Sequence, residues 1–330
     1  MQAARLIAAE TMRRKQDNGP EVGPGDVLVK VEAAGICGSD MHAFHGRDPR
    51  RVPPLILGHE LAGRVVEGPG AGRRVTVNPL ITCGQCEFCR QGRDNLCANR
   101  TMIGMTRAGG FAELMTTLAS SVIDIPQDMS ARAAALTEPA ATALHAINLA
   151  ARALARPLPE CEVLVLGGGA VGLLAALLLQ SYGVRNVTVG ETNRLRRESV
   201  ALAAPVRVYD PAADAAPAAG RFDLAIDAVG AAATRNAALA AVKPGAVVVH
   251  IGLLEGPSEI DMRRLTLAEI TLIGTYTYST ADLRATVEAL HGGAFGSLAW
   301  VEERPLADGA AAFADLHEGR SAAAKIVLCP

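Results

Sequence analysis

The chain has 330 residues, enough for two ordinary domains or for one large α/β unit. Half of the residues are hydrophobic and 20% are charged, a balance that fits a packed globular protein and excludes a disordered chain. The formal net charge is only -2, and Lys and Arg form no block. The sequence therefore gives no indication of binding to nucleic acid or to an anionic membrane.

The first 125 residues are predicted to be mostly β-structure. Val27–Ala33 and Arg73–Val77 are rich in Val and alternate in polarity, as strands with one buried face do. Turn-forming pairs of Gly, Pro and Asp separate such segments. Ser130–Ala155 is instead rich in Ala and Leu, which predicts a helix, and Ser130 is placed to cap its first turn.

From Val163 onward, short apolar segments alternate with helical ones. The predicted strands are Val163–Leu166, Val187–Val189, Val206–Tyr209, Leu224–Ile226, Val247–Ile251 and Leu272–Ile273. The predicted helices between them are Val171–Tyr182, Arg194–Ala203 and Ala232–Ala241. Such alternation predicts a parallel sheet with helices on both faces. Residues 281–330 are predicted to add two helices and a last strand, Ile326–Leu328.

One stretch, Val163–Val184, carries no charge over 22 residues and is long enough to cross a bilayer as a helix. Five glycines interrupt it, so a strand, a glycine turn and a buried helix explain it better. The N-terminal segment has neither the apolar core nor the small-residue cleavage site of a signal peptide. We therefore expect a cytoplasmic protein with no membrane partner.

A glycine motif of the form G-x-G-x-x-G lies between a predicted strand and a predicted helix, at Gly167, Gly169 and Gly172. These glycines permit a tight turn, the approach of a pyrophosphate and close helix–strand packing, and the helix N-terminus attracts phosphate. Glu191 follows Gly172 by 19 residues, where a carboxylate binds the adenosine ribose and favours NAD. Arg196 and its arginine neighbours follow closely, so NADP stays open as an alternative.

Four of the seven cysteines fall within fifteen residues, at Cys83, Cys86, Cys89 and Cys97. An odd total with one tight cluster is a poor disulfide framework, and clustered thiols in a reduced compartment typically bind metal. Four thiolates complete a tetrahedral zinc shell with no open position, which is typical of a structural site. An iron–sulfur cluster is disfavoured because seven residues precede the last cysteine and Ala98, not Pro, follows it.

Four further residues have side chains that suit a second zinc: Cys37, His59, Glu60 and Glu138. Fewer than four protein ligands would leave a position for water or substrate, as a Lewis-acid site requires. Taken alone, a single Cys is usually a small core residue and a His-Glu pair is usually polar packing. Spacing alone leaves both interpretations open.

The order of these motifs resembles that of the zinc-dependent medium-chain dehydrogenases over essentially the whole chain. The matching segments are Gly35–His42, Gly58–Gly63, the four-cysteine loop, Gly109–Glu113 and the glycine motif. The similarity is strongest to the branch of the sorbitol and threonine dehydrogenases, in which the third catalytic position is Glu, as Glu138 is here.

This resemblance implies a fold of the α/β class with two domains. A GroES-like, β-rich catalytic domain would comprise residues 1–139 and 279–330 and hold both zinc ions. A Rossmann domain with a doubly wound parallel sheet would comprise residues 140–278 and bind NAD. The family also leads us to expect a homodimer or a homotetramer.

The resemblance also implies roles for individual residues. Cys37 and His59 would bind the catalytic zinc, with Glu60 and Glu138 as alternating or water-linked ligands. Ser39 would pass the alcohol proton toward His42. Among the remaining residues, Gly252 and Leu253 would lie behind the nicotinamide, and Thr275 and Tyr276 would lie near it.

Some features depart from the family pattern. Residues 63–73 form a shorter hairpin than usual, and Glu191 replaces the more common Asp. Sorbitol dehydrogenases carry an Arg between two aromatic residues where this chain has Tyr276-Thr277-Tyr278, which puts a sugar-alcohol substrate in doubt. His45 matches a pocket-lining position, although a histidine in a surface loop is an equally good interpretation.

The sequence thus predicts an enzyme that transfers hydride between a secondary alcohol and NAD. The alcohol would be a polyol, a sugar derivative or a hydroxy-amino compound. The alternatives are an NADP-preferring alcohol or aldehyde reductase, a zinc-free quinone reductase, and a non-enzymatic NAD-binding or structural protein of the same fold. The intact Cys37 and His59 pair disfavours the last two.

Overall fold

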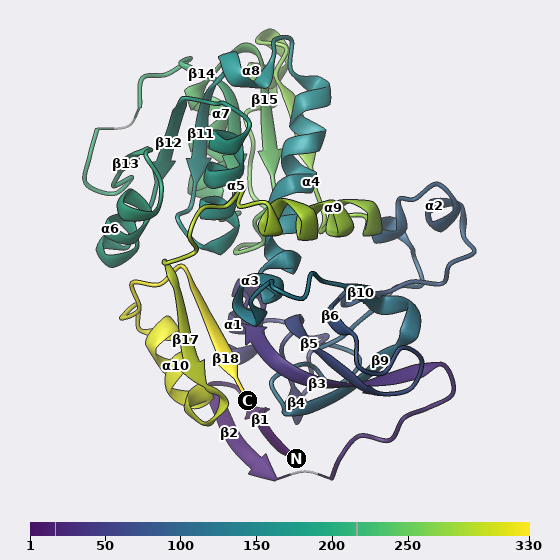
Figure 1. Ribbon diagram of the computed structural model, residues 1–330. Helices are drawn as coiled ribbons and strands as arrows, with labels where there is room; N and C mark the ends of the chain where they lie inside the picture. Colours follow the sequence, from purple (N-terminus) through teal and green to yellow (C-terminus); the bar gives the residue numbers. More distant parts are fainter. Residues whose placement is uncertain (17, 216) are drawn as a thin grey trace.

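The computed structural model describes residues 1–16, 18–215 and 217–330. Figure 1 shows a β-rich part, built from the first third of the chain and its last strands, beside an α/β part built from the middle of the chain. This arrangement confirms the predicted fold class. The boundaries proposed at residues 139 and 279 remain predictions, because helix α4, Thr137–Ala153, continues across the first of them.

The β-rich part is organised around a seven-stranded sheet in which β10, β6, β5, β3, β18 and β17 follow one another and β9 also pairs with β3. The strands are β3 Asp26–Gly35, β5 Glu60–Glu67, β6 Arg74–Val77, β9 Leu114–Leu118, β10 Val122–Asp124, β17 Val301–Pro305 and β18 Lys325–Cys329. Smaller sheets pair β1 Gln2–Ala8 with β2 Thr11–Gln16 and β4 Leu55–Ile56, and β7 Leu80–Ile81 with β8 Thr101–Met102. The C-terminal strand β18 thus returns to the N-terminal sheet, where Val327 pairs antiparallel with Gly35.

The α/β part contains a six-stranded parallel sheet in the order β13, β12, β11, β14, β15, β16. Its strands are β11 Glu162–Leu166, β12 Asn186–Gly190, β13 Arg207–Tyr209, β14 Phe222–Asp227, β15 Val242–His250 and β16 Thr271–Gly274. The helices that connect or flank them are α5 Ala170–Ser181, α6 Arg194–Ala203, α7 Ala232–Ala241, α8 Met262–Leu267 and α9 Thr280–His291. The parallel pairing of all six strands confirms the parallel sheet that the sequence predicts.

Helices cover both faces of this sheet, and successive side chains of a strand point to opposite faces, so side chains on both faces of its central strands are buried. On β11, Val163 and Val165 join the core shared with α4 and α5, whereas Leu164 and Leu166 join the core shared with α7. Each fully buried Val or Leu stabilises the fold by about 1.5–3 kcal/mol. The continuous apolar character of this strand follows from its two-sided burial.

The remaining helices are short or lie near the junction of the two parts. They are α1 Gly38–Phe44, α2 Glu87–Arg90, α3 Ala131–Ala135 and α10 Gly309–His317, with 3-10 turns at Asp94–Leu96, Ala119–Ser121, Leu158–Glu160 and Leu306–Asp308. The single helix predicted at Ser130–Ala155 is two helices, α3 and α4, interrupted at Leu136. Ser130 caps α3 as predicted, its hydroxyl oxygen accepting from the Ala133 N–H at 3.2 Å.

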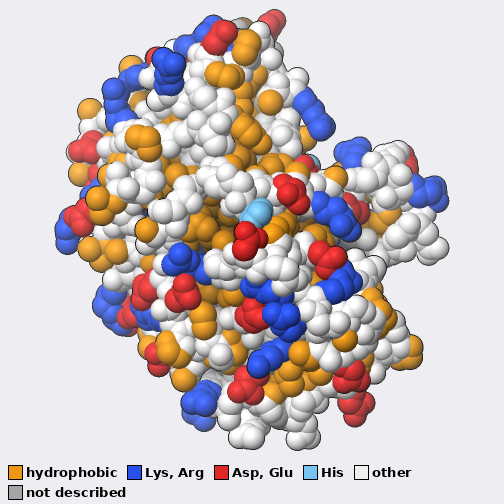
Figure 2. All heavy atoms as spheres, in the orientation of Figure 1, with side chains coloured by type: hydrophobic (Ala, Val, Ile, Leu, Met, Phe, Trp, Pro, Cys, Tyr) orange, Lys and Arg blue, Asp and Glu red, His pale blue; other side chains and the backbone are white. Residues whose placement is uncertain are grey.

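The uncharged stretch Val163–Val184 contains β11, a glycine turn and the 12-residue helix α5. In the described ranges of the chain, no helix combines the length and the apolar character needed to cross a bilayer. Figure 2 shows acidic and basic side chains interspersed over the face that it draws, with apolar side chains gathered where the two parts meet.

Candidate zinc sites and cofactor cleft

The four clustered cysteines converge on a small lobe between β7 and β8. Their Sγ atoms all lie within 4.8 Å of one another, with separations of 3.4 Å for Cys86–Cys89, 3.5 Å for Cys83–Cys97 and 3.9 Å for Cys83–Cys89. Thiolates on one tetrahedral zinc at about 2.3 Å stand about 3.8 Å apart. The lobe therefore fits a zinc with four protein ligands and no open position.

The backbone of this lobe already favours a thiolate. N–H groups of Gln85 and Cys86 donate to Cys83 and lower the pKa of its thiol to about 6. Because zinc binds the thiolate and not the thiol, this donation prepares Cys83 as a ligand.

The same lobe holds the segment that follows β16. The Asn95 side-chain amide donates to the Tyr276 carbonyl at 2.8 Å, and the Arg100 guanidinium lies 4.6 Å from the centre of the Tyr276 ring. Asp94 accepts from the Thr280 N–H at 3.1 Å and also from its hydroxyl. Tyr276, predicted to lie near the nicotinamide, is thus anchored on the cysteine lobe.

A second group of metal-binding side chains forms where β3 ends and β5 begins. Gly35, the last residue of β3, pairs with Glu60, the first residue of β5, and Cys37 lies two residues after Gly35. The ligand atoms of Cys37, His59 and Glu60 lie within 4.8 Å of one another. Gly35 is required here, because a Cβ on it would lie 2.2 Å from a Glu60 carboxylate oxygen. One thiolate, one imidazole and one carboxylate fit a zinc that keeps a position open.

Asp40, which sequence reasoning missed, orients this group. Its carboxylate lies 3.4 Å from His59 Nδ1 and accepts from the Cys37 N–H at 3.0 Å. Burial alone would raise the pKa of Asp40, but His59 and Arg51 hold it below its ordinary value. Because Nδ1 faces this carboxylate, Nε2 of His59 is left for a metal.

Glu138, at the start of α4, is buried beside this group without joining it. Its carboxylate accepts from the Tyr278 hydroxyl at 2.9 Å, and it lies outside the set of ligand atoms within 4.8 Å. Burial, assisted by the charge of Glu60, raises the pKa of Glu138 to about 7. Of the two carboxylates, only that of Glu60 has an oxygen within 4.8 Å of the ligand atoms of both Cys37 and His59.

Lys325, also missed from the sequence, lies on the other side of Glu60. Its Nζ stands 2.5 and 2.6 Å from the two carboxylate oxygens of Glu60 and donates to the Ile36 carbonyl at 2.8 Å. Both side chains are buried, at 2% and 0% exposure. Its position as the first residue of an apolar strand indicates burial but does not indicate Glu60 as its partner.

The two residues of the predicted proton relay lie on successive turns of α1. The Ser39 hydroxyl lies 3.3 Å from His59 Nε2 and accepts from the Arg51 guanidinium at 3.1 Å. His42 is half-buried, and burial together with Arg47 and Arg51 lowers its pKa. His45 ends the helix, with Nε2 2.8 Å from Nδ1 of His317.

A cleft of about 240 Å³ brings the glycine motif opposite the second metal group. It is lined by Cys37, Glu60 and Lys325 from the β-rich part and by residues 169–172 and Arg196 from the α/β part. Gly172 packs so closely on the turn that a Cβ would lie 1.9 Å from the Gly167 carbonyl oxygen. Gly169, by contrast, has nothing within 4 Å of the position of a Cβ, which leaves room for a bound group.

Glu191 lies at the end of β12 beside this cleft. Its carboxylate accepts from the Gly168 N–H at 2.9 Å and from the Asn193 N–H at 2.7 Å. Arg196 Nη1 stands 3.8 Å from the same carboxylate. The residues predicted to select between NAD and NADP are therefore adjacent.

The other residues predicted to contact the nicotinamide do not line this cleft. Gly252 donates its N–H to the Asp227 carbonyl at 3.0 Å and approaches Val229 too closely for any Cβ. Leu253 is 70% exposed, and the Thr275 N–H donates to the His250 carbonyl at 3.1 Å.

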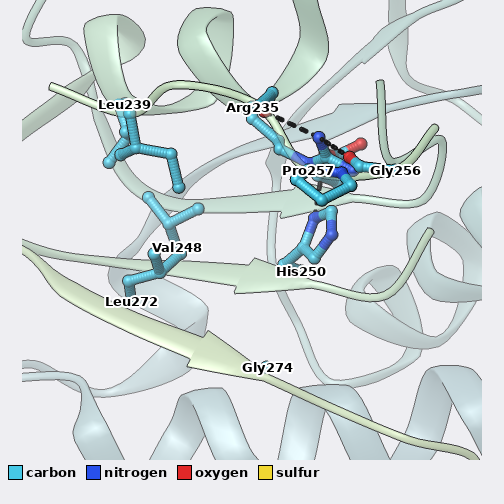
Figure 3. A pocket seen from close by; sticks show the side chains of 11 residues that line it. Arg235, Leu239, Val248, His250, Gly256, Pro257, Leu272 and Gly274 are labelled. Atoms are coloured by element: carbon cyan, nitrogen blue, oxygen red, sulfur yellow. Dashed lines mark hydrogen bonds and ion pairs between the residues drawn. The ribbon is translucent and has the colours of Figure 1, made fainter. Parts of the chain in front are cut away.

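A second pocket, of about 360 Å³, lies on the α7 face of the sheet and is lined mainly by α7, β15, β16 and residues 256–260. Figure 3 shows Val248, Leu239 and Leu272 on one side and Arg235 beside Gly256 on the other. The Arg235 guanidinium donates to the carbonyls of residues 230, 255 and 256 and to the Ser258 hydroxyl. These bonds fix the loop that follows Gly252.

Comparison with known proteins agrees with this geometry. The family model for the alcohol dehydrogenase GroES-like domain matches residues 23–127, and the model for zinc-binding dehydrogenase matches residues 170–292. L-galactonate-5-dehydrogenase of Escherichia coli strain K12 is 34% identical over 283 residues, covering 81% of each chain. L-threonine 3-dehydrogenase of Rhizobium johnstonii is 32% identical over 273 residues, covering 78% of this chain and 77% of the relative.

A zinc-binding dehydrogenase from Sinorhizobium meliloti 1021, solved with NADP bound, superposes with a TM-score of 0.87 at 31% identity over 100% of this chain and 99% of the other. The chain therefore belongs to the zinc-dependent medium-chain alcohol dehydrogenase family, in the branch of the polyol and threonine dehydrogenases. It is an NAD(P)-dependent oxidoreductase that uses zinc.

Proposed function

We propose that the chain oxidises the secondary alcohol of a polyol, a sugar acid or a hydroxy-amino compound, with Cys37, His59 and Glu60 holding the catalytic zinc. The observation that carries this proposal is that the three ligand atoms lie within 4.8 Å of one another and that two of the residues, Cys37 and Glu60, line the cleft opposite the glycine motif. The relatives that act on L-galactonate and L-threonine support these substrate classes.

A bound zinc would supply a Lewis acid that lowers the pKa of a substrate hydroxyl, and a bound nicotinamide would supply the acceptor for hydride from the carbon that carries this hydroxyl. The residues of the chain prepare the site for this reaction. Asp40 fixes the orientation of His59, and the negative charges of Cys37 and Glu60 compensate the metal.

We propose that Ser39 takes the proton of the alcohol. Arg51 donates to the Ser39 oxygen, which directs the hydroxyl hydrogen away from Arg51 and toward His59. With His59 Nε2 engaged as a zinc ligand, the Ser39 hydroxyl would be left to exchange a proton with a substrate. His42, one turn further along α1, would pass the proton onward.

We propose NAD as the preferred cofactor. The Glu191 carboxylate, at the end of β12, would accept hydrogen bonds from ribose hydroxyls, and its charge would repel a 2′-phosphate. Replacing Glu191 with Gln should raise the ratio of kcat/KM for NADP to that for NAD about tenfold. Glu198→Gln, which alters an exposed carboxylate on α6, should leave the ratio unchanged. An unchanged ratio in the Glu191 variant would contradict the role of this residue.

The substrate proposal is tested by a screen of NAD reduction with the zinc-loaded protein. L-galactonate, polyols, sugar phosphates and L-threonine are supplied beside simple primary alcohols of similar size. We expect the highest kcat/KM for a compound with a secondary hydroxyl next to another polar group. Faster oxidation of the simple primary alcohols than of every such compound would overturn the proposal.

We also propose that the protein is cytoplasmic and forms a homodimer or a homotetramer. All seven cysteines are free thiols, which fits a reducing compartment. Strand β16 is an edge of the parallel sheet, and exposed apolar side chains lie on or near it at Leu253, Leu254, Met262, Leu267 and Leu272. Light scattering should give twice or four times the 34.2 kDa of one chain.

A further inference from the structure

The ion pair between Lys325 and Glu60 at the candidate catalytic site is as deeply buried as the pair of Asp40 and His59. Lys325 is 3% exposed as a residue, and the Glu60 side chain is fully buried. Taking both charges out of water costs several kcal/mol per ion, which their attraction offsets only when the geometry is good. A lysine at the start of the apolar strand β18 therefore calls for an explanation beyond packing.

The sheet fixes where this ammonium group lies. Val327 of β18 pairs with Gly35 of β3, and Gly35 pairs with Glu60 of β5, so Lys325 lies two residues before the position of β18 that is level with Glu60. The Ile36 N–H donates to the Ile326 carbonyl at 2.9 Å, which extends this register to the residue before Cys37. Lys325 is thus held beside the metal group by backbone pairing and not by a flexible loop.

The hydrogen bonds of Lys325 are directed at the carboxylate that a metal would need. An ammonium group has three N–H donors, and here its contacts are the two oxygens of Glu60 and the carbonyl of Ile36. A metal bound to Cys37 and His59 would draw one Glu60 oxygen toward itself and away from Lys325. The two cations repel each other and share one anionic partner.

We propose that Lys325 is a positioning residue that competes with the catalytic zinc for the Glu60 carboxylate. This competition keeps Glu60 an exchangeable ligand, so that a coordination position can be vacated for the substrate. The inference rests on the proposed catalytic site at Cys37 and His59. A residue that merely orients Glu60 would strengthen zinc binding, whereas the role assigned to Lys325 weakens it.

The test is the affinity of this site for zinc in Lys325→Met, measured by competition with a chelator. The site is identified by its absence in Cys37→Ala. Loss of the competing cation should tighten zinc binding about tenfold or more. Lys243→Met removes a lysine that pairs with Asp223 on the α/β part and should leave the affinity unchanged. Weaker or unchanged zinc binding in Lys325→Met would overturn the proposal, since it would indicate an orienting role or none.

A metal-free Lys325→Met protein would leave Glu60 buried without a partner and could fail to fold. Lys325→Gln keeps a hydrogen-bond donor without the charge, and it should show the same tightening. In a Glu60→Gln background the substitution at Lys325 should tighten zinc binding much less, because there is no carboxylate to release. An equal gain in zinc affinity in both backgrounds would overturn the proposed competition for Glu60, since it would show only electrostatic repulsion between Lys325 and zinc.

Cobalt in place of zinc gives a second readout that does not depend on turnover. In Lys325→Met, Glu60 should remain on the metal, which raises the mean coordination number and weakens the d–d absorption of the cobalt protein. The KM for the alcohol should rise more than kcat falls. If the wild-type protein binds zinc only in the cysteine lobe, the proposed catalytic site fails; if it binds two ions and the Lys325 variants do not tighten, only this inference fails.

Discussion

The two groups of metal-binding side chains differ in nearly everything except the metal they suit. The four cysteines lie on a surface lobe, and three of them are partly exposed. Cys37 and Glu60 line the cleft between the two parts of the molecule, His59 lies behind them, and both His59 and Glu60 are buried. The cysteine lobe provides all four ligands itself, whereas the cleft site draws its partners Asp40, Lys325 and Glu138 from α1, β18 and α4.

This difference shows what an open site requires. A closed thiolate shell needs only the right spacing in one loop, because the metal satisfies all four ligands. An open site must keep buried charges in place when the metal or substrate is absent, so each buried group has a protein partner. Asp40 pairs with His59, Lys325 with Glu60, and Tyr278 with Glu138.

The strongest test of this contrast is Cys37→Ala. Loss of the thiolate should lower bound zinc from two ions to one and reduce kcat/KM by about a thousandfold or more, since Lewis-acid catalysis is lost. NAD binding should stay within about twofold, because the glycine motif is untouched. Cys161→Ala, at a buried thiol outside both groups, should keep two zinc ions. Metal analysis and steady-state kinetics measure the two effects. Full activity in Cys37→Ala would refute the assignment of Cys37 as a ligand of the catalytic zinc.

The corresponding change in the cysteine lobe, Cys97→Ser, should act mainly on stability. Removing one thiolate from a closed site should release that zinc and lower the free energy of unfolding by about 3 kcal/mol or more. The cleft zinc should remain. Activity should fall less than in Cys37→Ala, through loosening of Tyr276 and Thr280, which Asn95 and Asp94 hold. Cys329→Ser is the control; equal loss of both zinc ions in Cys97→Ser would contradict the independence of the two sites.

Tyr278→Phe tests whether the carboxylates of the open site need their partners. The change leaves buried Glu138 without its donor, which should cost about 1–3 kcal/mol. We expect kcat to fall about tenfold with an unchanged zinc content. Tyr182→Phe removes the hydroxyl of a partly exposed tyrosine on the α/β part and should have no effect. Chemical denaturation and metal analysis give the two readouts, and unchanged stability would argue that the Tyr278–Glu138 bond is dispensable.

The smallest effect is expected at Asp282 on α9, shortly after Tyr278 and Thr280, which contact Glu138 and the cysteine lobe. Burial would raise the pKa of Asp282, but hydrogen bonds from His145 and Ser279 lower it to about 2. A carboxylate with a depressed pKa stabilises the fold above its unfolded value of about 3.8 and loses that contribution as pH falls through about 2.

Asp282→Asn should therefore lower the free energy of unfolding by about 1–2 kcal/mol at neutral pH, after allowance for solvent screening. The difference from the wild type should shrink as pH falls from 4 toward 2. The control is Asp128→Asn. Asp128 is the exposed partner of His291, which lies on the same helix as Asp282, and this change should lower the free energy of unfolding by less than about 0.5 kcal/mol. An effect of Asp282→Asn that stays constant down to pH 2 would refute the ionic origin.

Elements with a strong local pattern were predictable from the sequence. The run Ala232–Ala241 was predicted as a helix with the same bounds as α7, and the buried Val and Leu runs gave the parallel strands. Strand β17, Val301–Pro305, was missed because its sequence, Val-Glu-Glu-Arg-Pro, shows no alternation of apolar and polar residues. Its pairing with β18 comes from the tertiary fold.

The candidate site was predictable only where its residues carry short motifs. The cysteine spacing and the glycine motif are local, and they point to zinc and NAD without further information. Lys325 lies 265 residues from Glu60, and Tyr278 lies 140 from Glu138, so nothing local connects either pair. A signal for Lys325 was present in retrospect, since a lysine leading directly into Ile326–Leu328 enters a buried strand.

The central claim is that one chain holds a closed zinc and an open zinc. Anomalous diffraction at the zinc edge, on crystals of the zinc-loaded protein, tests it most directly. We predict two peaks, one at bonding distance from Cys83, Cys86, Cys89 and Cys97, and one at bonding distance from Cys37 and His59 with a position open toward the cleft. A single peak in the cysteine lobe, or a second peak with four protein ligands and no open position, would contradict the account.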